Sequence, residues 1–381
     1  MNTVQRPRIV IAGTNSGVGK TTIVAGLLAA LTEQGKAVQA FKVGPDYIDP
    51  GFHKIASQRE CYNLDTWLVP PHKLIPFFVG QAETADISII EGVMGLYDGG
   101  REGVSSTAQV AKDLKAPVVL VIDCKAMGES AAAIAKGFRD YDPEVQFGGV
   151  ILNRLGSDNH EHMIRTAMKK LGVPVLGAIR RDERMQSPER HLGLTPVTEV
   201  DPTEAIATIR EAVKVMVNLD ALVELAQSAA DLSVETEEVV EAVEKRARIG
   251  IALDEAFSFY YPASLAALEA EGAELHYFSP LQDESLPDVD GIFFGGGFPE
   301  MFLSQLGNNE SMKDSIRKAS EKGMPIYAEC GGLMYMTEAV TDFEGNTYPM
   351  VGIVPATCEM QQSLQRVGYV SATMLEPSIL G

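Results

Sequence analysis

Residues 9–22 read IVIAGTNSGVGKTT, and this stretch decides the fold of the N-terminal part of the chain. An apolar run leads into a glycine-rich loop, and the following residues from Lys20 have the pattern of a helix. Such a strand, loop and helix surround phosphate with backbone N–H groups and a helix N-terminus. The regular spacing has glycine at position 14, where this chain has Thr14, with Gly13 one residue earlier. The context still predicts a nucleoside triphosphate site.

The predicted phosphate loop assigns roles to individual side chains. Lys20 would reach the β- and γ-phosphates, and the Thr21 hydroxyl would hold Mg²⁺. A further carboxylate is expected at a strand end. Glu91 is favoured because the glycine-rich GVMGLYDGG follows it, whereas Asp123 is interpreted as a strand-end cap. The residues expected around ATP are Gly13, Thr14, Asn15, Ser16, Gly17, Val18, Gly19, Lys20, Thr21 and Thr22.

Two further segments carry groups suited to this site. The stretch FKVGPDYIDPGFH, residues 41–53, concentrates reactive side chains and is predicted to be a substrate and metal loop. Its members are Lys42, Asp46, Tyr47, Asp49 and His53. His53 alone is interpreted as structural. Asn153, at the end of GGVILN, could bind an adenine edge through its amide or could simply cap a strand, and its spacing leaves both alternatives open.

The pattern along the chain predicts two α/β domains. Apolar strands alternate with helices, which is typical of a parallel sheet covered on both faces. The first set of strands is expected at Ile9–Ala12, Ala37–Val43, Ile87–Glu91, Val118–Asp123, Gly149–Asn153 and Val175–Ile179. We predict a P-loop domain at 1–195, a helical connection at 196–245, and a second domain at 246–381.

The second domain contains a cysteine in a glycine-rich turn. PIYAECGGLMYM, residues 325–336, predicts a strand, a tight turn at Cys330 and a helix, and a helix N-terminus lowers a thiol pKa. Upstream, DGIFFGGGFPE at 290–300 offers consecutive N–H groups that could stabilise an oxyanion. A small buried cysteine at a turn explains the spacing equally well.

Composition narrows the function classes. The net charge of −20 would repel phosphate backbones and anionic lipid, so neither nucleic-acid nor membrane binding is expected. Four dispersed cysteines, a start without a signal-peptide pattern and the lack of an apolar membrane span predict a cytoplasmic protein.

Seven motifs together resemble those of the cobyrinic acid a,c-diamide synthases, in the same order and over essentially the whole chain. They are GTNSGVGKTT, FKVGPDYIDPGFH, IIEGVMGLYDG, VILNRLGS, PERHLGL, FFGGGFPE and AECGGLMYM. The resemblance implies a P-loop domain of the dethiobiotin-synthetase type followed by a class I glutamine amidotransferase domain. It further implies a ligase of cobalamin biosynthesis that uses ATP and Mg²⁺ to activate two carboxylates of cobyrinic acid as acyl phosphates. Ammonia from glutamine then gives the amides.

The same resemblance assigns roles to residues of this chain. Cys330 matches the glutaminase nucleophile, and Gly297 with Gly331 match the oxyanion donors. Lys42 would be a second phosphate-facing lysine. Glu91 matches the Mg²⁺ carboxylate beside Thr21, Asn153 matches the residue that contacts adenine, and Tyr47, Asp49 and Asp98 lie in loops that look substrate-facing. Asp46, from the stretch 41–53, is expected to be a further metal ligand. PERHLGL has no role assigned beyond linking the domains, and a homodimer is left open.

One feature departs from the family pattern. The family's general base is a histidine well downstream of the nucleophile, but all six histidines of this sequence precede Cys330. Residues 365–369 resemble the segment that comes before that histidine. The expectation is therefore that a C-terminal portion of the amidotransferase domain is missing, and that free ammonia would serve better than glutamine.

Three alternatives remain from the sequence. The substrate could be hydrogenobyrinic acid or a nickel-sirohydrochlorin instead of cobyrinic acid. The first domain could be a MinD/ParA-like switch ATPase, although the signature lysine of that class is replaced by Asn15. A binding protein with an inactive amidotransferase domain is the third alternative.

Overall fold

The computed structural model describes residues 2–100, 103–182, 189–190, 193–194, 201–234, 243–362, 369–371 and 373. Two compact units divide the chain, Met1–Glu238 and Val239–Gly381. Residues 188, 191 and 192 of PERHLGL, and residues 365–368 of the segment that resembles the family's C-terminal region, lie outside the described residues. No helix in the described ranges is long and apolar enough to cross a membrane.

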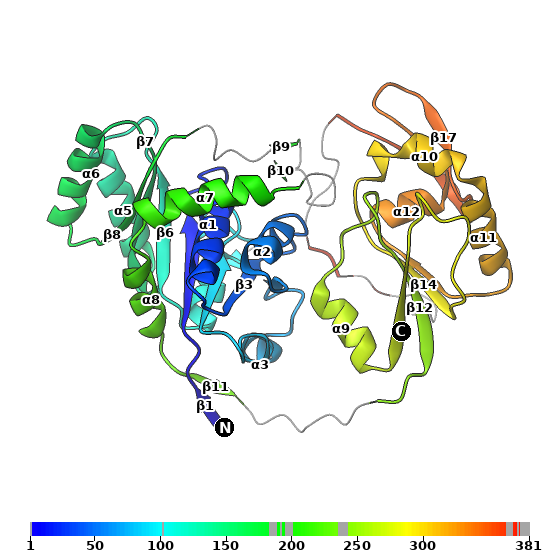
Figure 1. Ribbon diagram of the computed structural model, residues 1–381, viewed down its shortest axis with the longest axis horizontal. Helices are drawn as coiled ribbons and strands as arrows, with labels where there is room; N and C mark the ends of the chain where they lie inside the picture. The colour runs from blue at the N-terminus through cyan, green and yellow to red at the C-terminus, as the bar shows by residue number, and fades with distance from the viewer. Residues whose placement is uncertain are drawn as a thin grey trace. The chain divides into compact units, whose positions relative to one another are not determined.

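The first unit is built on a seven-stranded parallel sheet with the order β4-β3-β5-β2-β6-β7-β8 (Figure 1). Its strands are β2 (Arg8–Gly13), β3 (Val38–Val43), β4 (Tyr62–Leu64), β5 (Ile87–Glu91), β6 (Val118–Asp123), β7 (Phe147–Leu155) and β8 (Val175–Arg180). The six predicted strands are confirmed with small shifts of their ends, and β4 is an additional edge strand. A two-stranded sheet pairs β1 (Asn2–Val4) with β11 (Leu232–Val234), and β9 (Glu189–Arg190) pairs with β10 (Gly193–Leu194).

Helices cover both faces of this sheet because alternate strand residues are apolar on each side. Val10 and Ala12 of β2 pack on one face, and Ile9 and Ile11 pack on the other. The first face carries α3 (Pro71–Gln81), α4 (Thr107–Asp113), α5 (Ser130–Tyr141) and α6 (Asp158–Lys170). The second face carries α1 (Lys20–Glu33), α2 (Asp49–Ser57), α7 (Thr203–Met216) and α8 (Leu219–Gln227).

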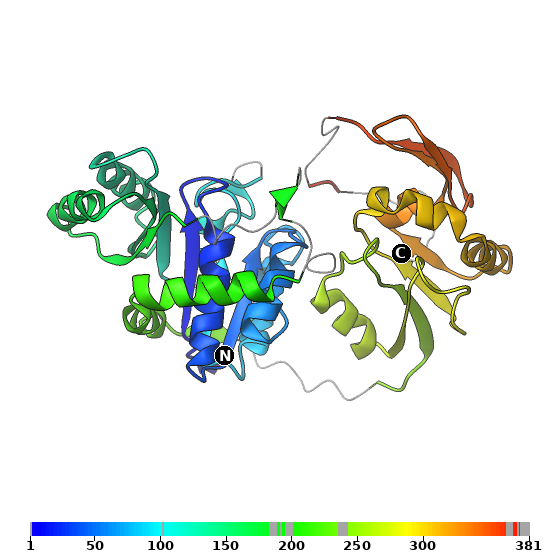
Figure 2. The ribbon, with the colours of Figure 1, turned by 45° about the horizontal axis from the view of Figure 1, so that its top comes forward.

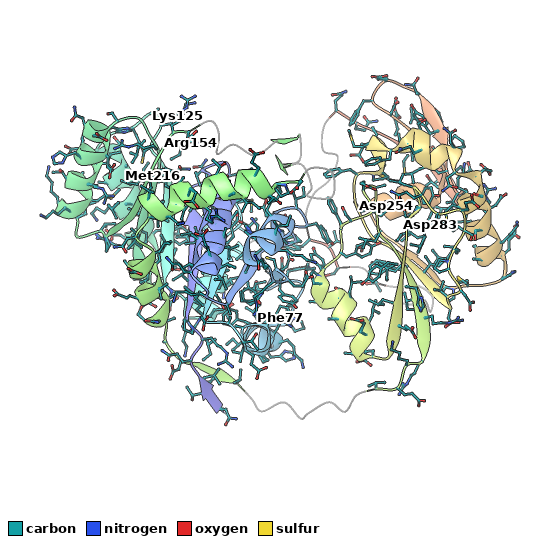
Figure 3. All side chains as sticks on the ribbon, viewed as in Figure 1. Phe77, Lys125, Arg154, Met216, Asp254 and Asp283 are labelled. Atoms are coloured by element: carbon teal, nitrogen blue, oxygen red, sulfur yellow. The ribbon has the colours of Figure 1, made fainter. Side chains whose placement is uncertain are left out.

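The structure differs from the sequence prediction at the segment expected to be a connection, residues 196–245. Its helices α7 and α8 are part of the first unit and bury Ile209, Val213 and Leu222 in the same core as α1. Figures 1 and 2 show α7 lying across α1. At the end of α7, Met216 accepts a hydrogen bond from the backbone N–H of Arg180, 3.3 Å away (Figure 3). The amphipathic pattern predicted the helices but did not reveal which core they cover.

A glycine allows the close approach of α1 and α7. A Cβ atom at Gly26 would lie 2.6 Å from a methyl of Val213 and 2.7 Å from a methyl of Ile209. Replacing Gly26 by valine should therefore overpack the contact and lower the free energy of unfolding by about 1–3 kcal/mol. Urea denaturation of the variant measures this loss.

Gly137 supplies the matched control for this prediction. It also lies inside a helix, α5, but a Cβ atom there would meet nothing within 4 Å. Gly137→Ala should leave the free energy of unfolding unchanged or raise it by up to ~1 kcal/mol, because alanine favours the helix. Equal stability of Gly26→Val and the parent chain would show that α7 is not packed on α1 in solution.

The second unit has its own parallel sheet with the order β13-β12-β14-β15. Its elements are β12 (Ala247–Ala252), α9 (Pro262–Ala270), β13 (Ala273–Phe278), β14 (Gly291–Phe294), η3 (Pro299–Met301), α10 (Leu303–Asn308), α11 (Glu310–Glu321), β15 (Ile326–Ala328) and α12 (Gly331–Met336). A smaller sheet follows, in which β16 (Thr337–Thr341) lies between β17 (Thr347–Pro349) and β18 (Val354–Glu359). The alternation predicted from the sequence is confirmed.

Candidate functional sites

The phosphate loop joins β2 to α1 at the carboxyl edge of the first sheet. Gly17 and Gly19 have φ values of 78° and 92°, which favour glycine strongly. Gly13 is also required, because a Cβ atom there would lie 2.8 Å from Val18 and 3.0 Å from the Lys20 Nζ atom. In this loop the glycine is therefore needed at position 13, where Val18 and Lys20 come close, and not at position 14 as in the regular pattern. Thr14 instead points its hydroxyl to Asn15 Oδ1, at 2.9 Å.

Lys20 is held over this loop by backbone carbonyl groups. Its Nζ atom donates to Met94 O at 2.6 Å and to Asn15 O at 3.3 Å. Burial lowers the pKa of Lys20, with Glu91 and Lys42 acting in opposite directions. The lysine is therefore preorganised among acceptors that a phosphate could replace, as a phosphate-binding lysine requires.

A buried group of charged side chains lies beside Thr21. The Thr21 hydroxyl contacts Glu91 Oε1 at 2.8 Å and Asp49 Oδ2 at 3.1 Å. Lys42 Nζ donates to the same two atoms, at 2.9 Å and 2.5 Å, and Asp46 Oδ2 lies 3.7 Å from it. Three carboxylates thus surround one lysine, which leaves an excess of negative charge next to the phosphate loop.

These contacts shift the pKa values of the group in opposite directions. Burial alone would lower the pKa of Lys42, but Asp49, Glu91 and Asp46 raise it well above its usual value. Burial would raise the pKa of Glu91, but Lys42 and His53 hold it below its usual range. Burial raises the pKa of Asp49 to about 6 against the effect of Lys42, with Glu91 adding to the rise. Glu91 is therefore the firmly ionised carboxylate of this group.

The side chains next to Thr21 suit Mg²⁺ by their chemistry. A hydroxyl and one or two carboxylates are the oxygen ligands that Mg²⁺ takes from proteins alongside phosphate. In the described part of the chain, no group of three or more His, Cys, Asp or Glu is arranged as a metal site of its own. The donor set therefore fits a cation that is bound together with a nucleotide.

The two aspartates of this stretch make different contacts, since Asp49 reaches Thr21 whereas Asp46 caps the turn before α2. Asp46, predicted as a metal ligand, accepts the backbone N–H groups of Ile48 and Asp49 at 2.8 Å and 3.0 Å, before α2 begins. Asp49, predicted to face the substrate, is the aspartate that contacts Thr21. The reason is the start of α2 at Asp49, which the sequence interpretation treated as a loop.

The remaining predicted residues lie along the same carboxyl edge. Tyr47 is half-buried in the turn before α2, and exposed Asp98 accepts the N–H of Gly95 at 3.0 Å. Asn153 Nδ2 donates to Val18 O at 2.7 Å, and it lies 2.5 Å from where a Cβ atom of Gly19 would be. Asn153 is therefore next to the phosphate loop, where a base attached to bound phosphates could reach it.

Asp123 acts as the strand-end cap that the sequence indicated. Its Oδ1 atom accepts the backbone N–H of Lys125 at 2.9 Å, and its Oδ2 atom accepts a hydrogen bond from Arg154 at 2.6 Å. Figure 3 shows Lys125 and Arg154 close together near the end of β7. Both carboxylate oxygens of Asp123 therefore already accept hydrogen bonds from neighbouring residues.

The second unit places Cys330 in a strained turn between β15 and α12. Its φ and ψ angles are 48° and −118°, which a residue with a side chain adopts rarely and at functional sites more than elsewhere. Met334 N–H bonds Cys330 O at 3.1 Å, and Gly332 N–H bonds Gly295 O at 3.0 Å. Cys330 is exposed, in contrast to the buried Cys61 and Cys124. The strained backbone and the exposed thiol are what a nucleophile needs and a buried structural cysteine does not.

Two backbone N–H groups face the Cys330 sulfur, those of Gly331 and Gly297, the predicted oxyanion donors. Gly297 must be glycine, because a Cβ atom there would lie 2.0 Å from Ala256 O. Tyr260 supports this loop: its hydroxyl accepts the N–H of Gly295 at 2.8 Å and donates to Ala252 O. Asp254, labelled in Figure 3, holds the bend after β12 by accepting the N–H of Ala256 at 2.9 Å.

The pKa of Cys330 differs from the sequence expectation. Desolvation by the surrounding protein raises it above its usual value, although the N–H groups of Gly331 and Gly297 act to lower it. A helix N-terminus was expected to lower the pKa, but α12 is only six residues long. The second unit's one histidine in the sequence, His276, lies on β13, where its Nε2 atom is 3.4 Å from Glu274 Oε1.

This arrangement predicts a pH profile for Cys330. Only the thiolate reacts with iodoacetamide, so the rate of alkylation should rise with pH and reach half its maximum above ~8.5, the ordinary thiol value. Gly297→Ala should move the profile further upward, because it displaces an N–H donor that favours the thiolate. Peptide mass spectrometry measures the rate, and buried Cys61 serves as the unreactive control. A half-maximum at neutral pH would contradict the desolvation described here.

Comparison with known proteins decides the family. Residues 9–194 match the CobQ/CobB/MinD/ParA nucleotide binding domain, and residues 248–379 match the CobB/CobQ-like glutamine amidotransferase domain. A cobyrinate a,c-diamide synthase of Dehalococcoides mccartyi is 44% identical over 385 residues, covering 98% of this chain and 82% of the relative. The chain belongs to the family of cobyrinate a,c-diamide synthases.

Other members of the cobyrinate a,c-diamide synthase family are similarly close. The Listeria innocua enzyme is 44% identical, covering 98% of this chain and 84% of its own length. The Methanosarcina acetivorans enzyme is 43% identical, covering 98% and 81%. Among solved structures, chloroplast FtsY from Physcomitrella patens aligns at 16% identity with a TM-score of 0.37, covering 59% of this chain and 66% of that one. That score is too low to bear on fold or function.

One residue of the site was missed from the sequence. His53 was interpreted as structural, but its Nε2 atom contacts Glu91 Oε2. The signal was its spacing, because Asp49 and His53 are four residues apart and share one face of α2. Recognising that face required placing the start of the helix at Asp49.

Proposed function

We propose that the chain is a glutamine-hydrolysing, ATP-dependent ligase that amidates the a and c acetate side chains of cobyrinic acid in cobalamin biosynthesis. The observation that carries the proposal is the presence of a phosphate-binding site and a cysteine site in one chain of this family. The first unit has a preorganised Lys20 over a phosphate loop. The second has Cys330 facing the N–H groups of Gly297 and Gly331.

The first unit would activate the substrate carboxylate. The phosphate loop and Lys20 would bind the phosphates of ATP, and Asn153 would contact adenine. Thr21, Glu91 and Asp49 would hold Mg²⁺, which supplies charge neutralisation at the transferred phosphoryl group. The substrate carboxylate would take the γ-phosphoryl group, releasing ADP and leaving an acyl phosphate. Tyr47 and Asp98 lie at the same edge and would orient the substrate.

The second unit would supply the nitrogen. The Cys330 thiolate would attack the side-chain amide carbon of glutamine, with Gly297 and Gly331 N–H groups stabilising the oxyanion. Release of ammonia leaves a γ-glutamyl thioester, which water cleaves to glutamate. Ammonia would displace phosphate from the acyl phosphate and give the amide. The same sequence repeated on the second acetate completes the diamide.

The test is amidation of cobyrinic acid followed by mass spectrometry. The chain is incubated with ATP, Mg²⁺ and either glutamine or ammonium. The mass change from an acid to an amide should occur twice with ammonium. The two nitrogen sources separate the two units, because only the reaction with glutamine depends on Cys330.

Each other outcome is informative. Amidation with ammonium but not with glutamine would show that Cys330 does not supply the nitrogen. No change with cobyrinic acid, but a change with hydrogenobyrinic acid or a nickel-sirohydrochlorin, would reassign the substrate. ATP hydrolysis without any amide would contradict the ligase function.

A further inference from the structure

His53 is completely buried on α2 and faces the charged group beside the phosphate loop. Its exposed fraction is 0%, and its Nε2 atom contacts Glu91 Oε2. Its backbone carbonyl accepts the Ser57 hydroxyl at 2.7 Å, one turn further along the same helix. Histidine is rarely placed without contact to solvent unless its ring makes a specific interaction. Here that interaction is with the firmly ionised carboxylate of the site.

The hydrogen bonds of Glu91 divide between its two oxygen atoms. Oε1 accepts from Lys42 at 2.9 Å and from Thr21 at 2.8 Å, on the side of the phosphate loop. Oε2 faces away from these donors and contacts His53. Glu91 also has an exposed fraction of 0%, so bulk solvent does not contact Oε2. His53 thus fixes the rotation of the carboxylate about its last bond.

The ring geometry agrees with a donating Nε2. An ionised carboxylate only accepts hydrogen bonds, so Nε2 carries the proton that is shared with Glu91. Nδ1 is buried and makes no hydrogen bond to any described residue. A ring that is bonded at one nitrogen alone can orient a ligand, but it is not part of a chain that passes protons onward. Its position behind Glu91 also keeps it from contacting a phosphate or a cation at Thr21.

We propose that His53 is a positioning residue that orients Glu91 toward the cation of the nucleotide site. This inference rests on the proposed function, in which Glu91 and Thr21 hold Mg²⁺ with ATP. Partners that orient metal ligands typically change metal affinity by about 10- to 100-fold when they are removed. Asp49 and His53 lie one turn apart on α2. The same face of this helix therefore supplies the Asp49 carboxylate and, through His53, orients the Glu91 carboxylate.

The test measures Mg²⁺ in a binding experiment that does not depend on catalysis. Calorimetry gives the affinity of the chain for ADP over a range of Mg²⁺ concentrations, and the midpoint of the Mg²⁺ dependence is the readout. His53→Leu removes the donor but fills much of the space. Its Mg²⁺ midpoint should rise by about 10- to 100-fold, while the affinity for ADP in EDTA stays the same.

Conservative variants separate orientation from packing. In His53→Gln the amide nitrogen can take the place of Nε2, whereas the side chain in His53→Asn is too short to reach Glu91. The midpoint of His53→Gln should therefore return to within about threefold of the parent, and that of His53→Asn should remain high. Because these variants differ mainly in reach, their comparison holds even where His53→Leu folds poorly.

His160 provides the matched control. It is a histidine of α6 whose Nε2 atom lies 2.6 Å from Met127 O and whose Nδ1 atom accepts the N–H of Gly156 at 3.1 Å. His160→Gln should change thermal stability without moving the Mg²⁺ midpoint.

Two results would overturn the proposal: a midpoint in His53→Leu within twofold of the parent, or equal midpoints in the Gln and Asn variants. If the parent chain itself shows no effect of Mg²⁺ on ADP affinity, the proposed function of the first unit fails instead.

Discussion

Replacement of Lys20 by methionine should reduce ATP-dependent amidation by roughly a thousandfold or more, because this side chain brings a positive charge to the phosphoryl group in transfer. The measurement is amide formation with ammonium as nitrogen source, which makes the result independent of Cys330. Among the described residues, Lys20 donates hydrogen bonds to two backbone carbonyls and makes no direct ion pair, so methionine breaks no salt bridge. The variant should therefore fold, and its loss of activity should come from phosphate binding.

Lys36 is the control for a simple change of net charge. It follows α1 in the turn that leads to β3, at the end of the helix away from the phosphate loop. Lys36→Met should keep activity within about twofold, since a charge at the far end of α1 is screened from the phosphate site. If Lys20→Met retains more than a tenth of the parent activity, the phosphate loop is not where ATP reacts.

The sequence predicted the phosphate loop because its signal is local. A strand, glycines at fixed offsets and a lysine at the start of a helix lie within fourteen consecutive residues. The structure adds why the irregular spacing works: Gly13 allows Lys20 to approach the end of β2. The turn around Cys330 was predictable for the same reason, although the direction of its pKa shift depended on the surrounding protein.

The charged group beside Thr21 could be predicted only in part, because two strands, β3 and β5, and two helices, α1 and α2, bring it together. The stretch 41–53 was predicted to be functional, but its helix was missed, and with it the positions of Asp49 and His53. A proline at position 50 suits the first turn of a helix as well as a loop. Similarly, the pattern of α7 indicated an apolar face without indicating that the face covers α1.

Lys42→Met should lower the free energy of unfolding by about 3–5 kcal/mol at pH 8 in EDTA, because it removes the buried cation that pairs with both Asp49 and Glu91. Asp46 adds a third negative charge at 3.7 Å from the same lysine. Urea denaturation of the isolated chain gives the difference. Lys54→Met on α2 is the control, because the Lys54 pair with Glu60 is exposed and should contribute at most ~1 kcal/mol.

The loss should be smaller at pH 5 than at pH 8. In the parent the pKa of Asp49 is raised to about 6, above the ~4 of an unfolded aspartate, so its contribution favours folding at low pH and is lost as the pH rises through 6. Without Lys42 the pKa of Asp49 rises further and that of Glu91 rises from its lowered value, so the range of loss extends upward. At pH 5 protonated carboxylates carry no negative charge, so the loss of the lysine costs less stability than at pH 8.

Saturating Mg²⁺ with ADP should restore much of the stability of Lys42→Met at pH 8. A divalent cation beside Thr21 would compensate the same carboxylates that Lys42 compensates, and ligand binding to the folded state alone raises stability by mass action. The recovery should exceed that of the parent chain under the same conditions. An equal effect in both chains would mean that Lys42 and the cation act on different charges, and the cation would then have to lie away from Glu91.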